Sequence, residues 1–293
     1  MKKKKSLITS IVALAAIVIG GYNALPSTVQ NTVEQEVLPK IGLSSLANAE
    51  NNENASTATA QKSKITDSAQ SSTSGVPYDT STYTQLSNLD FASGDYPVVE
   101  VNNNQSTLNI NDWQTSKVNY GDLDSLNRTT YATAYINKSN LGKSEGRSSQ
   151  KWSPTGWQQK TVDGQPIYNR GHLLAYTSSF NLDDDGNYVS GLDGSLDNPK
   201  NLATQSAFSN QRVQTVYEEK VRKAQAIKGN KVIYQIVTVF RGDELMPRGY
   251  WIQAIDSENT LNFNVYEYNV QPDVVFNYQD GSSKIDRSME VDY

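Results

Sequence analysis

The chain of 293 residues contains no cysteine and a single histidine, His172. The absence of cysteine excludes a thiol nucleophile, disulfide bonds and zinc sites built from thiolates. A metal site with several histidine ligands is excluded as well. If the protein moves protons at neutral pH with an imidazole, that imidazole is His172, because its ordinary pKa of about 6.5 suits the task. The alternative for this residue is a histidine that only packs beside a strand.

The first 25 residues are typical of an export signal. Lys2–Lys5 precede an apolar run from Leu7 to Ile19. Ser6–Leu25 also has about the 20 residues that span a bilayer, and the small-residue cleavage pattern Ala47–Ala49 lies far downstream. Residues 1–25 are therefore a signal peptide or a membrane anchor. In both cases the lysines stay inside, so the remaining chain is extracellular, either secreted or anchored to the outer face of the membrane.

Residues 26–86 form a predicted disordered linker, since Asn51–Gln85 is mostly Asn, Ser, Thr, Ala and Gln with few apolar residues. Residues 87–293 remain as one domain of roughly 200 residues. The formal net charge of the chain is −5, and the first 49 residues carry five lysines and two acids, so the rest carries −8. This balance does not by itself predict a nucleic-acid partner. A phosphate, however, responds to charges within about 10 Å.

The second half of the chain predicts an antiparallel sheet. Val232–Phe240, Tyr250–Ile255 and Leu261–Val270 are β-branched and aromatic runs separated by turn residues. Phe91–Leu108 is predicted as a strand pair, and Leu123–Leu141 as a mixed helix or strand region. Pro272 and the acidic tail after Asp280 close the domain.

One amphipathic helix is predicted between residues 209 and 227, with Ser209 as its N-cap and Gly229 as its stop signal. Its inward stripe consists of Val213, Tyr217, Val221 and Ala224. Polar side chains at a spacing of four form a row that flanks this stripe, namely Asn210, Gln214, Glu218 and Arg222.

The motif around the histidine resembles a known family. Asn169-Arg170-Gly171-His172 resembles the D-R-G-H signature of the Serratia-type DNA/RNA non-specific endonucleases. Trp152–Trp157, Asn198–Gln205 and Ala207–Gln211 look like segments of the streptococcal members of that family. The resemblance is strong from Ser149 to Lys223. It implies an α+β, ββα-metal (His-Me finger) nuclease fold, in which a central antiparallel sheet is flanked by helices.

The same residues satisfy the needs of phosphodiester hydrolysis. Neutral His172 can accept the proton of a water molecule, and Mg²⁺ can polarise the phosphate while Asn210 serves as its single direct protein ligand. Mn²⁺ is an alternative ion. Glu218 can hold a metal-bound water or orient a neighbour. Arg170 and Arg222 can donate charge-assisted hydrogen bonds to phosphate oxygens. The resemblance implies these same roles and adds a supporting role in catalysis for Asn201.

Each candidate also has a simpler explanation. Asn210 can be a helix-start residue, Glu218 and Arg222 a solvated surface ion pair, and Gly171 a turn residue. Trp152 and Trp157 favour core or loop packing over base stacking. Asp183–Tyr188 invites a calcium-loop interpretation, but it lacks the spaced ligands and closing glutamate of an EF-hand and favours a solvated β-turn.

The sequence departs from the family at Asn169, where an acid is usual. If that acid orients the arginine or the histidine by charge, the amide keeps the hydrogen bond, loses the ion pair and lowers the pKa of the histidine. Basic residues surround the motif on both sides in the sequence: Lys138, Lys143, Arg147, Lys151 and Lys160 before it, and Arg212, Lys220, Arg222, Lys223, Lys228 and Lys231 after it.

We expect these two basic segments, with Lys143 and Arg147 as phosphate-binding candidates, to follow a nucleic-acid backbone with little sequence preference. The predicted substrate is DNA, and the residues do not decide between DNA and RNA. Two other classes of protein stay open on the sequence alone. One is a surface protein that binds nucleic acid or sugar phosphates for uptake without cutting, and the other is a phosphatase or phosphodiesterase acting on small molecules.

Overall fold

The computed structural model of the protein describes residues 75–145 and 147–293. The predicted export segment at residues 1–25 and the predicted linker up to residue 74 lie outside the described residues. Within the described ranges no helix has both the length and the apolar character needed to cross a membrane.

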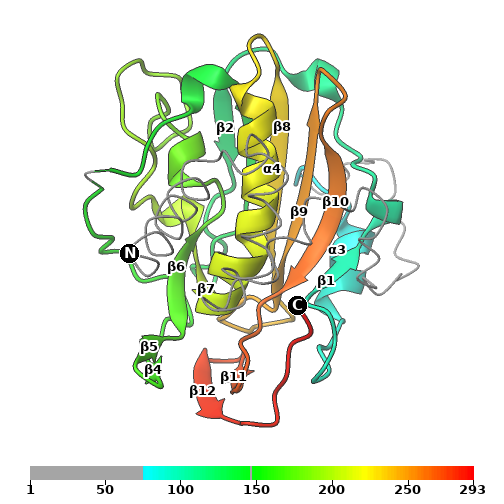
Figure 1. The fold of residues 1–293 in the computed structure, drawn as a ribbon, viewed down its shortest axis with the longest axis vertical. Helices are drawn as coiled ribbons and strands as arrows, with labels where there is room; N and C mark the ends of the chain where they lie inside the picture. Colours follow the sequence, from blue (N-terminus) through cyan, green and yellow to red (C-terminus); the bar gives the residue numbers. More distant parts are fainter. Residues whose placement is uncertain (1–74, 146) are drawn as a thin grey trace, which may run out of the picture. The chain divides into compact units, whose positions relative to one another are not determined.

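The fold is built on a six-stranded antiparallel sheet with the strand order β1-β10-β9-β8-β3-β2 (Figure 1). Its strands are β1 (Val98–Glu100), β2 (Lys117–Tyr120), β3 (Tyr131–Ile136), β8 (Val232–Val239), β9 (Gly249–Asp256) and β10 (Asn262–Tyr268). The three long strands confirm the runs predicted after residue 231. Neighbouring strands pair in order, with Ile252 of β9 opposite Ile236 of β8 and Val265 of β10.

The predicted strand pair in Phe91–Leu108 is wrong, because only β1 forms there and it pairs with β10. The chain turns immediately after this strand. Asn102, Asn103 and Asn104 have φ values of 49°, 54° and 59°, a left-handed conformation that asparagine tolerates better than most residues. A second strand cannot continue through three such residues.

The sheet is covered on both faces. Successive residues of a strand point in opposite directions, so each face contributes side chains to a buried cluster of its own. On one face Ile236 and Ile252 pack with Val213 and Val221 of the long helix, and this is the face that the helix covers in Figure 1. On the other face a second cluster of buried residues includes Leu86, Val99, Val237 and Trp251. All residues of β8 are buried as a result.

The folded domain begins earlier than predicted. Helix α3 (Thr80–Ser87) falls inside the predicted linker, and its Leu86 is fully buried in the second core cluster. The Asp79 carboxylate accepts a hydrogen bond from the Thr82 backbone N–H and so caps this helix. Tyr78 also packs against Trp251. The boundary at residue 87 is therefore several residues too late, because it ignores these anchoring contacts.

A separate pair of strands contains the histidine and leads into the long helix. Strand β6 (Tyr168–His172) pairs antiparallel with β7 (Leu202–Ser206), and His172 lies opposite Leu202. The chain then enters a π-helical turn, η9 (Ser209–Gln214), and α4 (Thr215–Ala226). This order of two strands and a helix is the ββα unit that the sequence predicted. Gly171 lies inside β6 without a positive φ, so the turn interpretation of this glycine is wrong.

The predicted N-cap of the helix is also wrong. Residues 207 and 208 are already helical, and the Ser206 hydroxyl accepts a hydrogen bond from the Ser209 backbone N–H at 2.9 Å. Ser206 therefore caps the helix, and Ser209 lies buried in its first turns. The helix ends at Ala226, close to the predicted end. Asn230 donates to the Ala224 carbonyl, and Gly229 takes a φ of 86°, as its predicted role requires.

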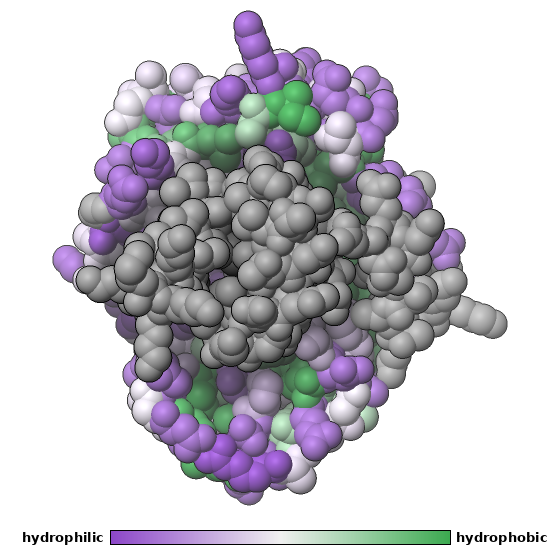
Figure 2. Space-filling model, viewed as in Figure 1, coloured by the Kyte–Doolittle hydropathy of each residue, from purple (hydrophilic) through white to green (hydrophobic). Residues whose placement is uncertain are grey.

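Shorter elements complete the described part of the chain. The segment Asp183–Tyr188 forms a turn in which the Gly186 backbone N–H donates to the Asp183 carbonyl, which confirms the predicted β-turn. The segment after Pro272 contains a hairpin that the sequence analysis missed. Where the described residues are visible in Figure 2, hydrophilic side chains alternate with small hydrophobic patches. The remaining strands are β4 (Thr161–Val162), β5 (Gln165–Pro166), β11 (Val274–Asn277) and β12 (Ser282–Ile285), and the 3₁₀ turns are η4 (Asn102–Asn104), η5 (Ile110–Asp112), η6 (Lys138–Asn140), η7 (Tyr176–Ser178) and η8 (Pro199–Asn201).

We predict that Ile252→Ala lowers the free energy of unfolding by about 2–5 kcal/mol, because it leaves a cavity between the sheet and α4. Ile285→Ala is the matched control, since Ile285 is 52% exposed on β12 and its truncation should cost little. Urea unfolding of both variants measures the difference. Equal losses would mean that the core does not lie under α4.

Candidate active site

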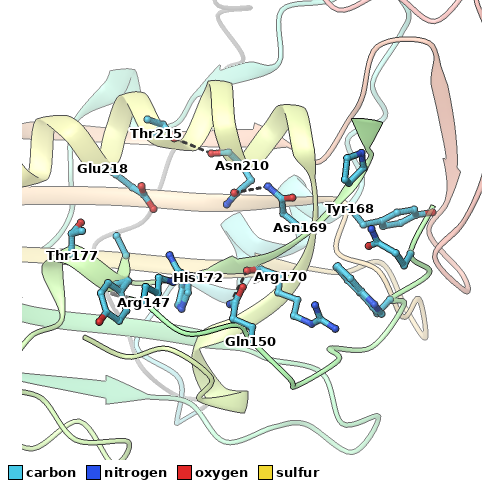
Figure 3. A pocket seen from close by; sticks show the side chains of 15 residues that line it. Arg147, Gln150, Tyr168, Asn169, Arg170, His172, Thr177, Asn210, Thr215 and Glu218 are labelled. Atoms are coloured by element: carbon cyan, nitrogen blue, oxygen red, sulfur yellow. Dashed lines mark hydrogen bonds between the residues drawn. The ribbon is translucent and has the colours of Figure 1, made fainter. Parts of the chain in front are cut away.

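A cavity of about 610 Å³ lies between strand β6, the first turns of the long helix and the segment around Arg147 (Figure 3). It brings together five of the eight site residues that the sequence predicted: Arg147, Arg170, His172, Asn210 and Glu218. Lys143, Asn201 and Arg222 are not among its lining residues. The cavity is therefore the place where the predicted chemistry can be examined.

His172 lies at the end of β6, is 8% exposed and lines the cavity. Its Nε2 atom is 3.0 Å from the carbonyl oxygen of Leu196. Because a carbonyl oxygen can only accept, Nε2 must carry the ring proton and donate it. Nδ1 then holds the lone pair of the neutral ring, so it is the atom that can accept a proton. This tautomer is a result of the fold that the sequence analysis did not predict.

Burial, and to a smaller extent the positive charge of Arg147, lower the pKa of His172 to about 4. The carbonyl groups of Leu196 and Ser195 and the charge of Asp197 oppose this shift. The pKa is thus lowered chiefly by burial of the ring. At neutral pH the imidazole is uncharged and ready to act as a base.

The amide of Asn169 lies against Asn210, as Figure 3 shows. The Nδ2 group of Asn169 donates to Oδ1 of Asn210 at 2.9 Å, and Nδ2 of Asn210 donates to Oε1 of Gln205 at 2.9 Å. Asn210 lies within the π-helical turn rather than at the helix start. Such turns are common at functional sites. The unusual residue of the motif therefore contacts the predicted metal ligand.

Glu218 lies two turns further along the helix, and its side chain is only 15% exposed. Its Oε1 accepts from Gln214 at 3.1 Å, and its Oε2 is 3.4 Å from Nη1 of Arg222. Burial raises the pKa of Glu218, while the charges of Arg222 and Arg147 and the Gln214 hydrogen bond counteract this effect. The pair with Arg222 is thus no solvated surface ion pair, since the acid faces the cavity.

Arg170 is positioned by the segment that precedes the motif. Its Nε donates to the carbonyl of Trp152, and its guanidinium lies 4.4 Å from the centre of the Trp157 ring. Trp157 also packs edge-on against Tyr168. The packing interpretation of this tryptophan therefore agrees with its position, and the packing holds a cation at the cavity. Arg147 lies over the Tyr176 ring at 5.1 Å.

Asn201 is fully buried and supports the loop behind His172. Its Oδ1 accepts from the Leu174 backbone N–H at 2.8 Å, and its Nδ2 donates to the Leu174 carbonyl at 3.0 Å and to the Ser195 hydroxyl at 3.2 Å. These bonds tie the end of the β6 loop to the segment that holds the His172 ring. Lys143 is exposed.

The oxygen atoms of the cavity fit a hard divalent cation. Asn210 and Glu218 offer an amide oxygen and a carboxylate, and in the described ranges no three His, Cys, Asp or Glu side chains form a metal-holding group. Mg²⁺ suits such a sparse ligand set, because it keeps several of its own waters. The donor chemistry therefore fits a magnesium ion held by Asn210, with Glu218 near its water shell.

Comparison with known proteins identifies the family. The family model described as DNA/RNA non-specific endonuclease matches residues 106–257, which is more than half of the chain. The chain belongs to this family. It is an endonuclease with the ββα-metal fold, which confirms the fold class predicted from the sequence, and it hydrolyses DNA. The cofactor of such an endonuclease is a divalent metal ion.

Two solved structures support the assignment. The crystal structure of NucA from Streptococcus agalactiae with magnesium ion bound has a TM-score of 0.56 and 27% sequence identity, and the match covers 67% of this chain and 90% of that chain. The structure of the same protein with no metal bound has a TM-score of 0.57 and 27% identity, with 74% and 100% covered. The likeness thus extends over most of the described residues of the endonuclease.

Sequence reasoning placed Gln214 in the polar row of the helix but gave no role to it or to the other polar groups beneath the cavity. Gln205, Gln214 and Glu267 are all fully buried, and they link the histidine strand to the helix. The one signal for them was Glu267, an acid inside the otherwise apolar and aromatic run of β10. A charge-bearing residue in a buried strand calls for a partner.

The pH dependence of the endonuclease tests the state of His172. Since the pKa of the ring is lowered, the base stays unprotonated as pH falls through 6.5, and kcat/KM should fall only as pH approaches about 4. Arg147→Gln should move this acid limb to higher pH, because it removes a positive charge that disfavours the imidazolium. The exposed Lys284→Gln is the charge-matched control. An acid limb near pH 6.5 in the unmodified enzyme would contradict the buried environment of the ring.

Proposed function

We propose that the protein is an exported, Mg²⁺-dependent nuclease that cuts DNA, and also RNA, without sequence preference. The observation that carries this proposal is the meeting of His172, Asn210, Glu218 and two arginines on one cavity. Mn²⁺ would substitute for Mg²⁺. The export segment at residues 1–25, the linker after it and the extracellular location follow from the sequence pattern, with the segment either cleaved or kept as an anchor.

His172 acts as the general base. Its Nδ1 takes a proton from a water molecule, and the water oxygen forms the new bond to phosphorus. The bond from phosphorus to the leaving oxygen breaks, and the alkoxide that leaves takes a proton from a second water molecule. The Leu196 carbonyl keeps Nε2 protonated and so keeps Nδ1 available. Arg147 disfavours a second proton on the ring, which keeps the base neutral before the reaction.

Asn210 would hold the metal ion through Oδ1, and Glu218 would orient a water molecule beside it. When bound, Mg²⁺ supplies Lewis-acid polarisation of the phosphate and charge neutralisation at the leaving oxygen. Arg170 and Arg147 reach phosphate oxygens from the cavity wall, while Arg222 sets the Glu218 carboxylate. Lys143 binds backbone phosphate outside the cavity, and Asn201 keeps the His172 loop in place.

No base-reading element enters this account. The cations along the cavity recognise phosphate, which DNA and RNA share, and phosphate contacts carry no sequence information. We therefore include RNA as a substrate and expect little dependence on base composition.

Plasmid nicking is the direct test of His172. His172→Ala should abolish cleavage in Mg²⁺ while DNA binding and folding stay close to those of the unmodified protein, because only the proton acceptor is lost. The unmodified protein should cut in Mg²⁺ and stop in EDTA. Substantial cutting by His172→Ala would assign the base to another group. Parallel assays on RNA and on bis-p-nitrophenyl phosphate separate a polymer nuclease from a small-molecule phosphodiesterase.

The metal requirement tests Asn210. Asn210→Ala should raise the Mg²⁺ concentration for half-maximal cleavage, because it removes the only direct protein ligand of the proposal. An unchanged requirement would assign the metal to other residues.

Asn169→Asp should act in the opposite direction and lower the Mg²⁺ concentration for half-maximal cleavage by roughly 10-fold. The carboxylate cannot donate to Oδ1 of Asn210 and leaves two facing acceptors, which a cation relieves. Asn277→Asp is the control, since it adds the same charge on exposed β11 and keeps the hydrogen bond from the Gln279 backbone N–H. A raised metal requirement in Asn169→Asp would show that the Asn169 donor helps metal binding.

A further inference from the structure

A chain of buried amides connects the proposed base to the proposed metal ligand. The Nε2 group of Gln214 donates to the carbonyl oxygen of His172 at 2.8 Å and to Oε1 of Glu218 at 3.1 Å. Oε1 of Gln214 accepts from Nε2 of Gln205 at 2.8 Å, and Oε1 of Gln205 accepts from Nδ2 of Asn210 at 2.9 Å. These two glutamines and Glu267, whose carboxyl group contacts Gln205, are called the relay below.

The direction of this relay is fixed at its ends. The backbone carbonyl of His172 and the carboxylate of Glu218 can only accept, so Gln214 must turn its NH₂ group toward them. The Gln214 oxygen then faces Gln205, which must donate a hydrogen bond to it from its own NH₂ group. The oxygen of Gln205 is left to face Asn210, whose NH₂ group must point inward.

Glu267 contacts Gln205 from the other side, and its contact agrees with this direction. Its Oε1 accepts from Nε2 of Gln205 at 2.9 Å and lies 3.4 Å from the Ser209 hydroxyl. Glu267 is fully buried in β10, and burial raises its pKa well above the usual range, with the charge of Glu218 adding to the effect. A buried acid in an apolar strand is costly, and its contact with Gln205 gives it a structural reason.

Burial prevents the relay from reversing. Gln205, Gln214 and Glu267 are each 0% exposed, so water cannot compensate a flipped amide, and a flip would place two acceptors face to face. Gly171 of β6 leaves the necessary room. A Cβ atom at this position would collide with Oε1 of Gln205, the atom that holds Asn210. The glycine before the histidine thus protects the relay rather than making a turn.

We propose that Gln205, Gln214 and Glu267 are positioning residues that turn the Asn210 carbonyl oxygen toward the cavity and so set the affinity for the divalent ion. This inference rests on the proposed role of Asn210. It assigns no contact with substrate to the relay. It also links the orientation of the metal ligand to strand β6, since the His172 carbonyl accepts the hydrogen bond at one end of the relay.

The test is direct Mn²⁺ binding, followed by electron paramagnetic resonance of free Mn²⁺, with no substrate present. Gln205→Met, Gln214→Met and Glu267→Leu should each weaken Mn²⁺ binding by about 10- to 100-fold. Glu267→Gln keeps an acceptor for Gln205 and should bind within a few-fold of the unmodified protein. In cleavage assays, saturating metal should restore much of kcat in the weakened variants, with KM for DNA little changed.

Gln225→Met is the matched control. Gln225 is a fully buried glutamine on the same helix, and its Nε2 donates to the carbonyls of Asn137 and Ser178, away from the cavity. It should lose stability in thermal unfolding but keep Mn²⁺ affinity. If Gln225→Met weakens Mn²⁺ binding as much as Gln205→Met and Gln214→Met, general destabilisation explains the effect and the relay is refuted.

Asn210→Ala distinguishes the proposed metal ligand from the proposed role of the relay. If Asn210→Ala binds Mn²⁺ as well as the unmodified protein, the proposed ligand is wrong and the relay has nothing to position. If Asn210→Ala loses affinity while the three relay variants keep it, the ligand stands and the relay is overturned. Loss of affinity in all four, with Glu267→Gln spared, supports the relay.

Discussion

The hydrogen bond from Asn210 to Gln205 is the interaction on which the proposed chemistry of this endonuclease depends. An asparagine amide has one oxygen and one nitrogen end, and only the oxygen can hold a cation. The partner at Gln205 decides which end faces the cavity. A metal site with one direct protein ligand has no second ligand to correct a wrong orientation. The buried polar groups beneath the cavity are therefore as important as those that line it.

The fold explains how such an orientation can be kept. Strand β7 carries Gln205, the π-helical turn carries Asn210, and β10 of the large sheet carries Glu267, so three elements of separate origin meet at one glutamine. The sheet is packed on both faces and holds β10 rigidly. A site that is assembled in this way gains precision from the core rather than from flexible surface side chains.

Much of this arrangement could be predicted from the sequence. The rest could not, because it depends on contacts between residues far apart in the chain. The long strands β8 to β10 show themselves through β-branched runs, and the histidine motif and the helix row place His172, Asn210 and Glu218 correctly around one cavity. Periodicity does not reveal partners. The ring tautomer of His172 depends on the Leu196 carbonyl, and the role of Asn169 depends on a helix that lies 41 residues further along the chain. The N-cap at Ser206 was hidden because this residue also ends strand β7, and the helix begins directly after it.

A crystal of the protein soaked in Mn²⁺ and measured at an anomalous wavelength tests the central claim most directly. The account predicts one strong anomalous peak in the cavity, within about 2.3 Å of Oδ1 of Asn210, with its remaining ligands mostly water. A peak on other side chains with none at Asn210, for example at the acidic turn of Asp183–Asp185, would contradict it.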